Sequence, residues 1–175
     1  MELANLLGRK APYSVSDLLY VYSTRDLPFA AALGLAAWWF APEQLHSFSE
    51  YLTMFGGFVN LVLLTVGIGP LLETVFFVIF ILITPATWYQ SEPDAVGTFG
   101  RQVILSVVCG TLFGALHLST SIVAAISAAI GGAVMFAVLL QHWQANLRDR
   151  GIAMCWAIHV VHNALMLLLS AAFPW

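Results

Sequence analysis

The sequence predicts an all-α protein, a polytopic transmembrane bundle of about six spans with a four-helix catalytic core. Two observations predict this class. Hydrophobic residues make up 61% of the 175 residues and charged residues only 9%, against about 45–50% and about 25% in soluble domains. The apolar residues also fall in runs that approach the roughly 20 residues of a membrane span. Too few polar side chains exist to cover a soluble surface, and the net charge of -3 with no basic cluster argues against nucleic-acid binding.

The N-terminal part predicts an interfacial segment followed by two spans. Residues 1–26 mix charged side chains with a short apolar stretch, which is typical of a helix lying at the membrane surface. Residues 27–68 contain two apolar runs, at 27–41 and 51–68, and predict two transmembrane helices. A Gly-Ile-Gly-Pro sequence ends the second run. Because proline fits the first turn of a helix and not its interior, we expect a third helix to begin near Pro70.

Residues 69–175 predict the four-helix core. Its expected helices are Pro70–Trp88, Arg101–His117, Ser121–Trp143 and Ile152–Phe173. Polar loops are expected at 92–97, at Ser119-Thr120 and at 148–151.

Glu73 is the only charged residue inside any predicted span. A charge at bilayer depth costs at least ~2.5–3.5 kcal/mol, which makes it a functional candidate. A structural alternative is that Glu73 lies near the interface and interacts with the helix dipole. Three histidines lie in the apolar spans, His117, His159 and His162, and Asn163 directly follows the last of them. Since His159 and Asn163 are four residues apart, they lie on one helix face.

These residue types suit amide hydrolysis without a covalent nucleophile. A carboxylate in a partly desolvated site can act as general base on water, and a neighbouring histidine can orient that water. A second histidine and an asparagine amide can donate hydrogen bonds to the oxyanion. Alternatively, Glu73, His117 and His159 could hold zinc with an open fourth position. A carrier that binds haem or a small ion through the histidines is a further alternative.

Three motifs resemble those of the CPBP family, the CAAX protease and bacteriocin-processing intramembrane proteases, which include the type II CAAX prenyl endopeptidases. The family's Ala-Pro-x-x-Glu-Glu-x-x-Phe-Arg corresponds to Gly69-Pro70-Leu71-Leu72-Glu73-Thr74-Val75-Phe76-Phe77-Val78. Its Phe-x-x-x-His is matched by Phe113–His117, and its His-x-x-x-Asn by His159–Asn163. The resemblance covers about residues 67–169, the whole predicted core.

The resemblance implies a glutamic-type intramembrane endopeptidase. Glu73 corresponds to the general base, His117 to its helper in activating water, and His159 with Asn163 to the oxyanion hole. Thr74 and Val78 depart from the pattern, because the family has glutamate and arginine there. Losing both charges leaves no orphan buried charge, which can be nearly neutral for stability. We expect activity to be retained, because the four groups nearest the chemistry are all present. A non-catalytic scaffold or chaperone subunit is the alternative.

The implied setting is the cell (inner) membrane, as a multi-pass protein. The expected partners are the lipid bilayer and a membrane-associated protein or peptide as substrate, with a membrane protein partner as a further option. No cofactor is expected, zinc being the alternative. We expect Cys109 and Cys155 to be buried free thiols, and His46 and His142 to be solvated at loop or interface positions.

Overall fold

The computed structural model describes residues 48–89 and 98–172, together with isolated positions nearer the N-terminus. Its elements are α4 (Phe48–Met54), α5 (Phe58–Val62), the π-helix η3 (Leu63–Ile68), α6 (Gly69–Ile83), the 3₁₀ turn η4 (Ala86–Trp88), α7 (Thr98–Leu116), α8 (Ile122–Gln144) and α9 (Arg148–Ala172). Within this part of the chain every regular element is helical, which confirms the predicted all-α class. The predicted interfacial segment and the first predicted span lie outside the described ranges.

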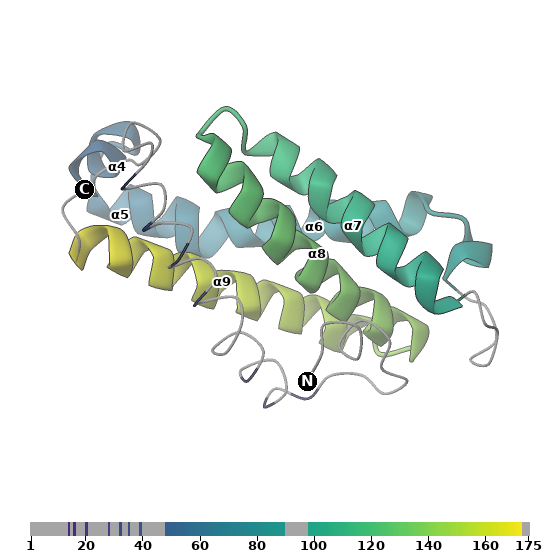
Figure 1. Cartoon of the computed structure of the whole chain (residues 1–175). Coiled ribbons are helices and arrows are strands. Elements are labelled where there is room, and N and C mark those ends of the chain that lie inside the picture. The colour runs from purple at the N-terminus through teal and green to yellow at the C-terminus, as the bar shows by residue number, and fades with distance from the viewer. Residues whose placement is uncertain are drawn as a thin grey trace.

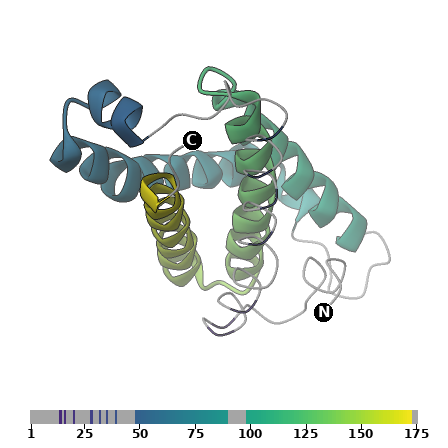
Figure 2. The same cartoon turned by 60° about the vertical axis from the view of Figure 1, so that its left-hand side comes forward.

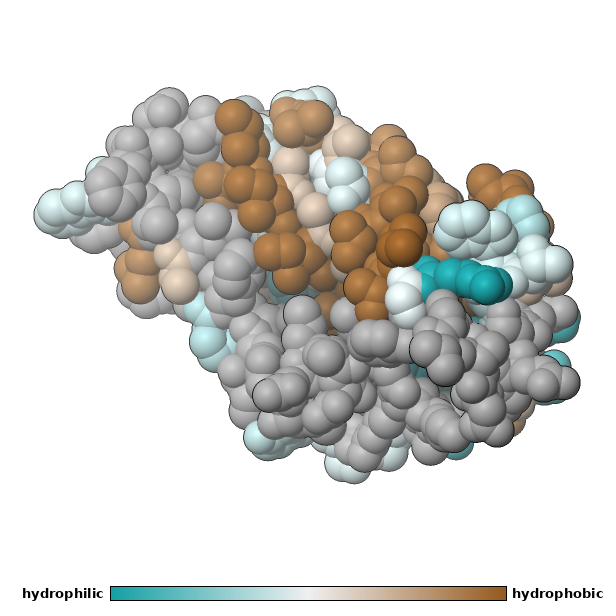
Figure 3. Space-filling view, turned by 45° about the vertical axis from the view of Figure 1, so that its right-hand side comes forward, coloured by the Kyte–Doolittle hydropathy of each residue, from teal (hydrophilic) through white to brown (hydrophobic). Residues whose placement is uncertain are grey.

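Three described helical segments are long and apolar enough to cross a membrane: Phe58–Ile83, Ile122–Gln144 and Arg148–Leu168. A fourth, Gly100–Leu116, is apolar but shorter. Large hydrophobic side chains are exposed along α6 and α7, including Leu72, Leu82 and Ile104. Figure 3 shows one face on which such residues form a broad hydrophobic area. An exposed apolar surface of this extent is expected of helices that face lipid.

The structure differs from the prediction over residues 51–88. The second predicted run is interrupted at Gly56 (φ 69°) and Gly57 (φ 120°), because both adopt backbone angles that favour glycine. Beyond them α5, η3 and α6 form one 26-residue helical segment, about 39 Å long at 1.5 Å per residue. At the expected break, Gly67–Pro70, the structure therefore has a π turn running into α6 within one continuous helical segment, rather than a loop between two helices.

The connection from α8 to α9 is tighter than predicted. Residues 148–151 form the first turn of α9, not a loop. The chain reverses at Asn146, whose φ is 58°. The N–H of Leu147 donates to the His142 carbonyl and that of Asn146 to the Trp143 carbonyl. These two bonds form the motif that ends helices with a left-handed residue, and asparagine serves here in place of the usual glycine.

Helices α7 and α8 pack closely along their whole length as an antiparallel pair (Figures 1 and 2). Their approach depends on residues without side chains. A Cβ on Gly114 would lie 2.5 Å from the Ala125 carbonyl oxygen, and one on Gly132 would lie 2.7 Å from the Phe113 ring. Small residues allow helix backbones to approach closely in membranes. Ser121 caps the start of α8 by accepting a hydrogen bond from the Ala124 N–H.

Helix α9 packs beside α8 and also contacts α6 (Figure 2). The buried core that these four helices share is rich in aromatic rings. Its fully or almost fully buried phenylalanines are Phe77, Phe113 and Phe136.

At the end of the α7–α8 pair that lies far from His117, the contacts are polar. The side chain of Gln102 donates to Gln144 at 3.1 Å, and Gln144 in turn donates to the Tyr89 carbonyl. His142, near this end, is completely buried, and its Nδ1 donates to the Val138 carbonyl at 2.9 Å. The prediction that His142 is solvated is therefore wrong, because α9 begins at once and Gly151 packs against the His142 Cβ. His46 lies outside the described ranges.

Candidate functional site

Glu73 lies on α6, three residues after Pro70. Its side chain is 28% exposed, so the carboxylate lies among the helices without being sealed from the surroundings. Glycine and proline at positions 69 and 70 fix where α6 begins and so fix the height of Glu73 in the bundle. An acid within an apolar helix bundle needs polar partners, because apolar surroundings offer none.

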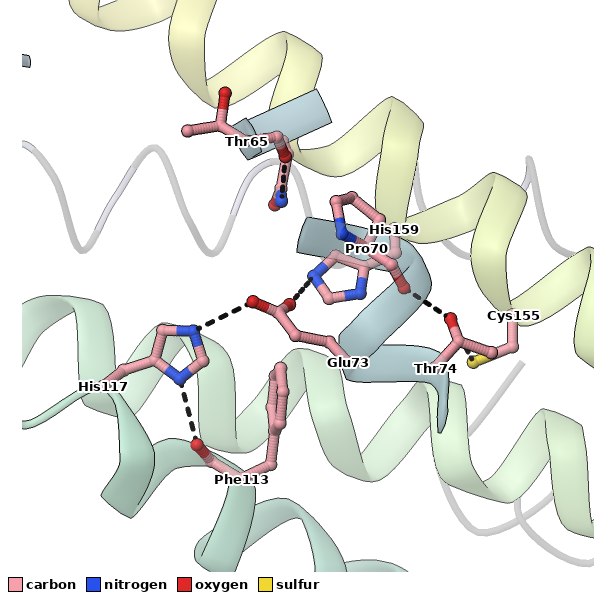
Figure 4. Close-up of polar contacts among 9 residues, drawn as sticks. Thr65, Pro70, Glu73, Thr74, Phe113, His117, Cys155 and His159 are labelled. Carbon is pink, nitrogen blue, oxygen red and sulfur yellow. Dashed lines mark hydrogen bonds and ion pairs between the residues drawn. The ribbon is translucent and has the colours of Figure 1, made fainter. Parts of the chain in front are cut away.

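Two imidazoles from other parts of the fold face the Glu73 carboxylate (Figure 4). Nε2 of His159, on α9, lies 2.7 Å from Oε2 of Glu73. Nε2 of His117, in the turn after α7, lies 3.7 Å from Oε1. The two rings differ in exposure, with 29% of the His117 side chain exposed and 5% of that of His159. The site thus has one buried imidazole and one accessible imidazole around a single carboxylate.

The protonation of His117 follows from its second ring nitrogen. Nδ1 lies 3.0 Å from the Phe113 carbonyl oxygen. Because a carbonyl oxygen only accepts hydrogen bonds, Nδ1 carries a proton. In the neutral ring Nε2 is then an acceptor that faces another acceptor, Oε1 of Glu73. The 3.7 Å between them exceeds hydrogen-bond length, so a group that can donate two hydrogen bonds fits this position.

His159 has the opposite arrangement. Its Nε2 is in contact with Glu73, whereas its Nδ1 is buried without a hydrogen-bond partner among the described residues. Oε2 of Glu73 also has no hydrogen-bond partner in this part of the chain, so the 2.7 Å contact is an ion-pair distance rather than a hydrogen bond. A neutral ring with its proton on Nε2 keeps only a lone pair on Nδ1 and directs its N–H toward the carboxylate. His159 therefore anchors one oxygen of Glu73 and leaves the other toward His117.

Phe113 positions both imidazoles. Its ring is in edge contact with His117 and with His159, at centroid distances of 4.8 Å and 5.9 Å. The Phe113 ring in turn packs against the Phe77 ring, with a centroid distance of 4.9 Å, and against Gly132, where a side chain would collide with it. The sequence shows Phe113 only as the first position of a motif, and nothing in it indicates this double contact.

Asn163 has a partner that the sequence did not predict. Its Nδ2 donates a hydrogen bond to the backbone carbonyl of Thr65 at 2.7 Å. Thr65 lies in η3, and its hydroxyl donates a hydrogen bond to the Leu61 carbonyl at 2.6 Å. The structure therefore brings Glu73, His117 and His159 together, and it joins Asn163 to the helix that leads into Glu73.

Thr74 and Val78 occupy apolar surroundings. Thr74 is 1% exposed, and its hydroxyl donates to the Pro70 carbonyl at 2.7 Å and lies 4.0 Å from the sulfur of Cys155. Val78 packs against the aromatic core. The surroundings of both positions are unfavourable for an unpaired charge. Cys109 and Cys155 are both buried and free, as predicted.

Among the described residues, no three His, Cys, Asp or Glu side chains are grouped as a metal site requires. Zinc thus remains an alternative predicted from the sequence alone. Comparisons with protein-family models, with curated proteins and with solved structures found no match. The resemblance to the CPBP proteases accordingly rests on the three motifs.

Proposed function

We propose that this protein is an intramembrane endopeptidase that hydrolyses a peptide bond in a membrane-associated substrate. The observation that carries the proposal is the Glu73 carboxylate held between His159 and His117, with its free side toward His117. One acid with two imidazoles from two other elements is costly to place at bilayer depth without a use.

We propose that a water molecule lies beside the Glu73–His117 pair, whose facing atoms are 3.7 Å apart. When His117 is neutral with its proton on Nδ1, its Nε2 and Oε1 of Glu73 are both acceptors, and one water can donate a hydrogen bond to each. Its lone pair then points away from both, toward a substrate carbonyl. A general base must lie within direct or one-water reach of the proton that it removes, and a water at this position would meet that condition for Glu73.

The reaction follows from these positions. Glu73 takes a proton from the water while the water oxygen attacks the carbonyl carbon and forms a tetrahedral oxyanion. The proton then passes to the leaving nitrogen, and the carbon–nitrogen bond breaks. We assign oxyanion stabilisation to Asn163, because its amide has a second N–H beyond the one that donates to Thr65. The sequence predicts the same role for His159, but the single N–H of its neutral ring faces Glu73, so we assign His159 to holding that carboxylate.

We further propose that the helices bearing these residues form a four-helix core across the cell membrane. Segments 58–83, 122–144 and 148–168 have the length for it. The shorter α7 ends at Leu116, and His117 in the turn that follows lies next to the Glu73 carboxylate. A substrate anchored in the same bilayer would reach the exposed sides of Glu73 and His117 laterally.

The test compares membranes from cells that express the wild type or Glu73→Gln, with new peptide N-termini identified by mass spectrometry. We expect termini that appear with the wild type and fall by about 10²-fold or more with Glu73→Gln, as for loss of a general base. His117→Ala should reduce the same termini. Glu50→Gln, on α4, is the matched control and should leave them unchanged. Identical termini with wild type and Glu73→Gln would refute the proposal.

A second candidate is a non-catalytic membrane scaffold, favoured by the uncharged Thr74 and Val78. It predicts that a membrane protein co-purifies equally with wild type and Glu73→Gln, with no new termini. If termini do appear, loss of cleavage on chelation together with stoichiometric zinc in the pure protein would favour the zinc version.

A further inference from the structure

The helix that leads into Glu73 has a backbone defect with a defined cause. In η3 the hydrogen bonds run from residue i to i+5, as shown by the Gly69 N–H, which donates to the Leu64 carbonyl. The next bond of this series would run from residue 70 to the Thr65 carbonyl. Residue 70 is proline and has no N–H. Thr65 is therefore left with a carbonyl that its own helix does not satisfy.

Asn163 supplies the missing donor. Its Nδ2 lies 2.7 Å from the Thr65 carbonyl oxygen, and it reaches there from α9. In lipid an unsatisfied backbone carbonyl costs free energy that a neighbouring helix can recover by donating a side-chain hydrogen bond. Gly69 belongs to the same arrangement, because a Cβ there would collide with the Leu64 carbonyl.

We propose that Asn163 is a positioning residue that replaces the N–H lacking at Pro70 and thereby fixes the start of α6 against α9. Glu73 lies one turn after Pro70, and His159 lies one turn before Asn163. The Asn163–Thr65 bond and the Glu73–His159 contact consequently join the same two helical segments, one turn apart along α9 and about two turns apart along segment 58–83. The inference concerns the structure of the site, and it stands independently of whether the protein cleaves peptides.

The test is a double-mutant cycle with Asn163→Ala and Pro70→Ala in the full chain, purified in detergent. The Pro70→Ala variant regains an N–H at position 70. Whether the segment keeps the π turn or becomes α-helical, Thr65 then has a backbone donor, residue 70 or residue 69. We expect Asn163→Ala to lower the Tm by about 2–5 °C when Pro70 is present. In the Pro70→Ala background it should lower the Tm by less than half as much.

A local readout accompanies the Tm. Hydrogen exchange of the Gly69–Val75 amides should accelerate in Asn163→Ala and return toward the wild-type rate in the double variant. Gln102→Ala is the matched control. The side-chain amide of Gln102 also donates a hydrogen bond between helices, but this bond has no relation to Pro70. Its effect on the Tm should be equal in both backgrounds.

Equal losses from Asn163→Ala in both backgrounds would overturn the proposal, as would no loss in either. If Asn163→Ala does not fold with Pro70 present, recovery of folded protein in the double variant supports the proposal, and failure of both overturns it. Asn163→Ser, which keeps a shorter donor, should lie between wild type and alanine. None of these outcomes depends on Glu73, so they are separate from the test of proteolysis.

Discussion

Two of the helix–helix interfaces in this bundle, α7–α8 and α6–α9, are built in opposite ways. Helices α7 and α8 meet through glycines and alanines, with one neutral amide pair, Gln102 and Gln144, at one end. Helices α6 and α9 meet through polar groups, with Glu73 on His159 and Thr74 near Cys155. The first interface is specified by shape and the second by the pairing of donors with acceptors.

This difference explains why the candidate site lies where it does. A steric interface leaves no room for a substrate or a water molecule, and sealing α7 on α8 gives a rigid base that carries Phe113 and His117. An interface made of hydrogen bonds places reactive groups at depth and can leave one of their faces open. These two interfaces can be tested by placing a charge in one, by adding volume to the other, and by removing one polar pair from each.

The largest effect is expected from a charge placed in the α6–α9 interface. Thr74→Glu puts a carboxylate at a position that is 1% exposed, with the Cys155 sulfur nearby and Val78 one turn on. Whether it stays ionised or takes up a proton, the cost should be about 3 kcal/mol or more. Reversible unfolding in mixed micelles measures it. Thr74→Val keeps the shape and loses only the hydroxyl, so about 1 kcal/mol is expected. A Thr74→Glu variant as stable as Thr74→Val would show that this interface tolerates unpaired charge.

The second effect concerns volume in the α7–α8 interface. In Gly114→Val the new Cβ would lie 2.5 Å from the Ala125 carbonyl oxygen and 2.6 Å from the Ala129 Cβ, and the helix backbones must separate. Overpacking of this kind costs about 1–3 kcal/mol. Gly100→Ala is the matched control on the same helix, since its Cβ would meet no atom within 4 Å. That variant should be neutral or stabilised by up to about 1 kcal/mol. Equal unfolding free energies for the two variants would contradict a steric interface.

Much of the helical framework follows from the sequence because apolar length and helix breakers are local properties. The start of α6 next to Pro70 and the limits of α8 were predicted within one or two residues. The π turn was not predicted. Gly67 and Pro70 suggest a loop, unless a donor from another helix satisfies the backbone carbonyl that lacks a partner because proline has no N–H. The reversal at Asn146 was missed for a related reason, since the sequence signal there is one asparagine rather than glycine.

For the candidate site, the sequence supplied the residues but not their partners. A lone acid and histidines in apolar spans are conspicuous, so Glu73, His117 and His159 could be singled out. The partner of Asn163 is a backbone carbonyl of Thr65, and no side-chain pattern reveals a backbone acceptor. His142 was taken for a solvated residue because it lies near a chain reversal, whereas Gly151 brings α9 over it.

The most direct comparison measures one polar pair from each interface, and one of these pairs has the smallest value expected. Two double-mutant cycles are needed, Glu73→Met with His159→Phe and Gln102→Met with Gln144→Met. We expect a coupling free energy of about 1.5–3 kcal/mol for Glu73 with His159, since one partner is charged and the other is 5% exposed. For the two glutamines, which are neutral and 3.1 Å apart at the bundle end, about 0.6 kcal/mol is expected. Unfolding in the same micelles supplies all values. Equal coupling free energies would mean that the polar pair at the α6–α9 interface stabilises it no more than the glutamine pair stabilises α7–α8. Glu73 would then be held there by packing alone.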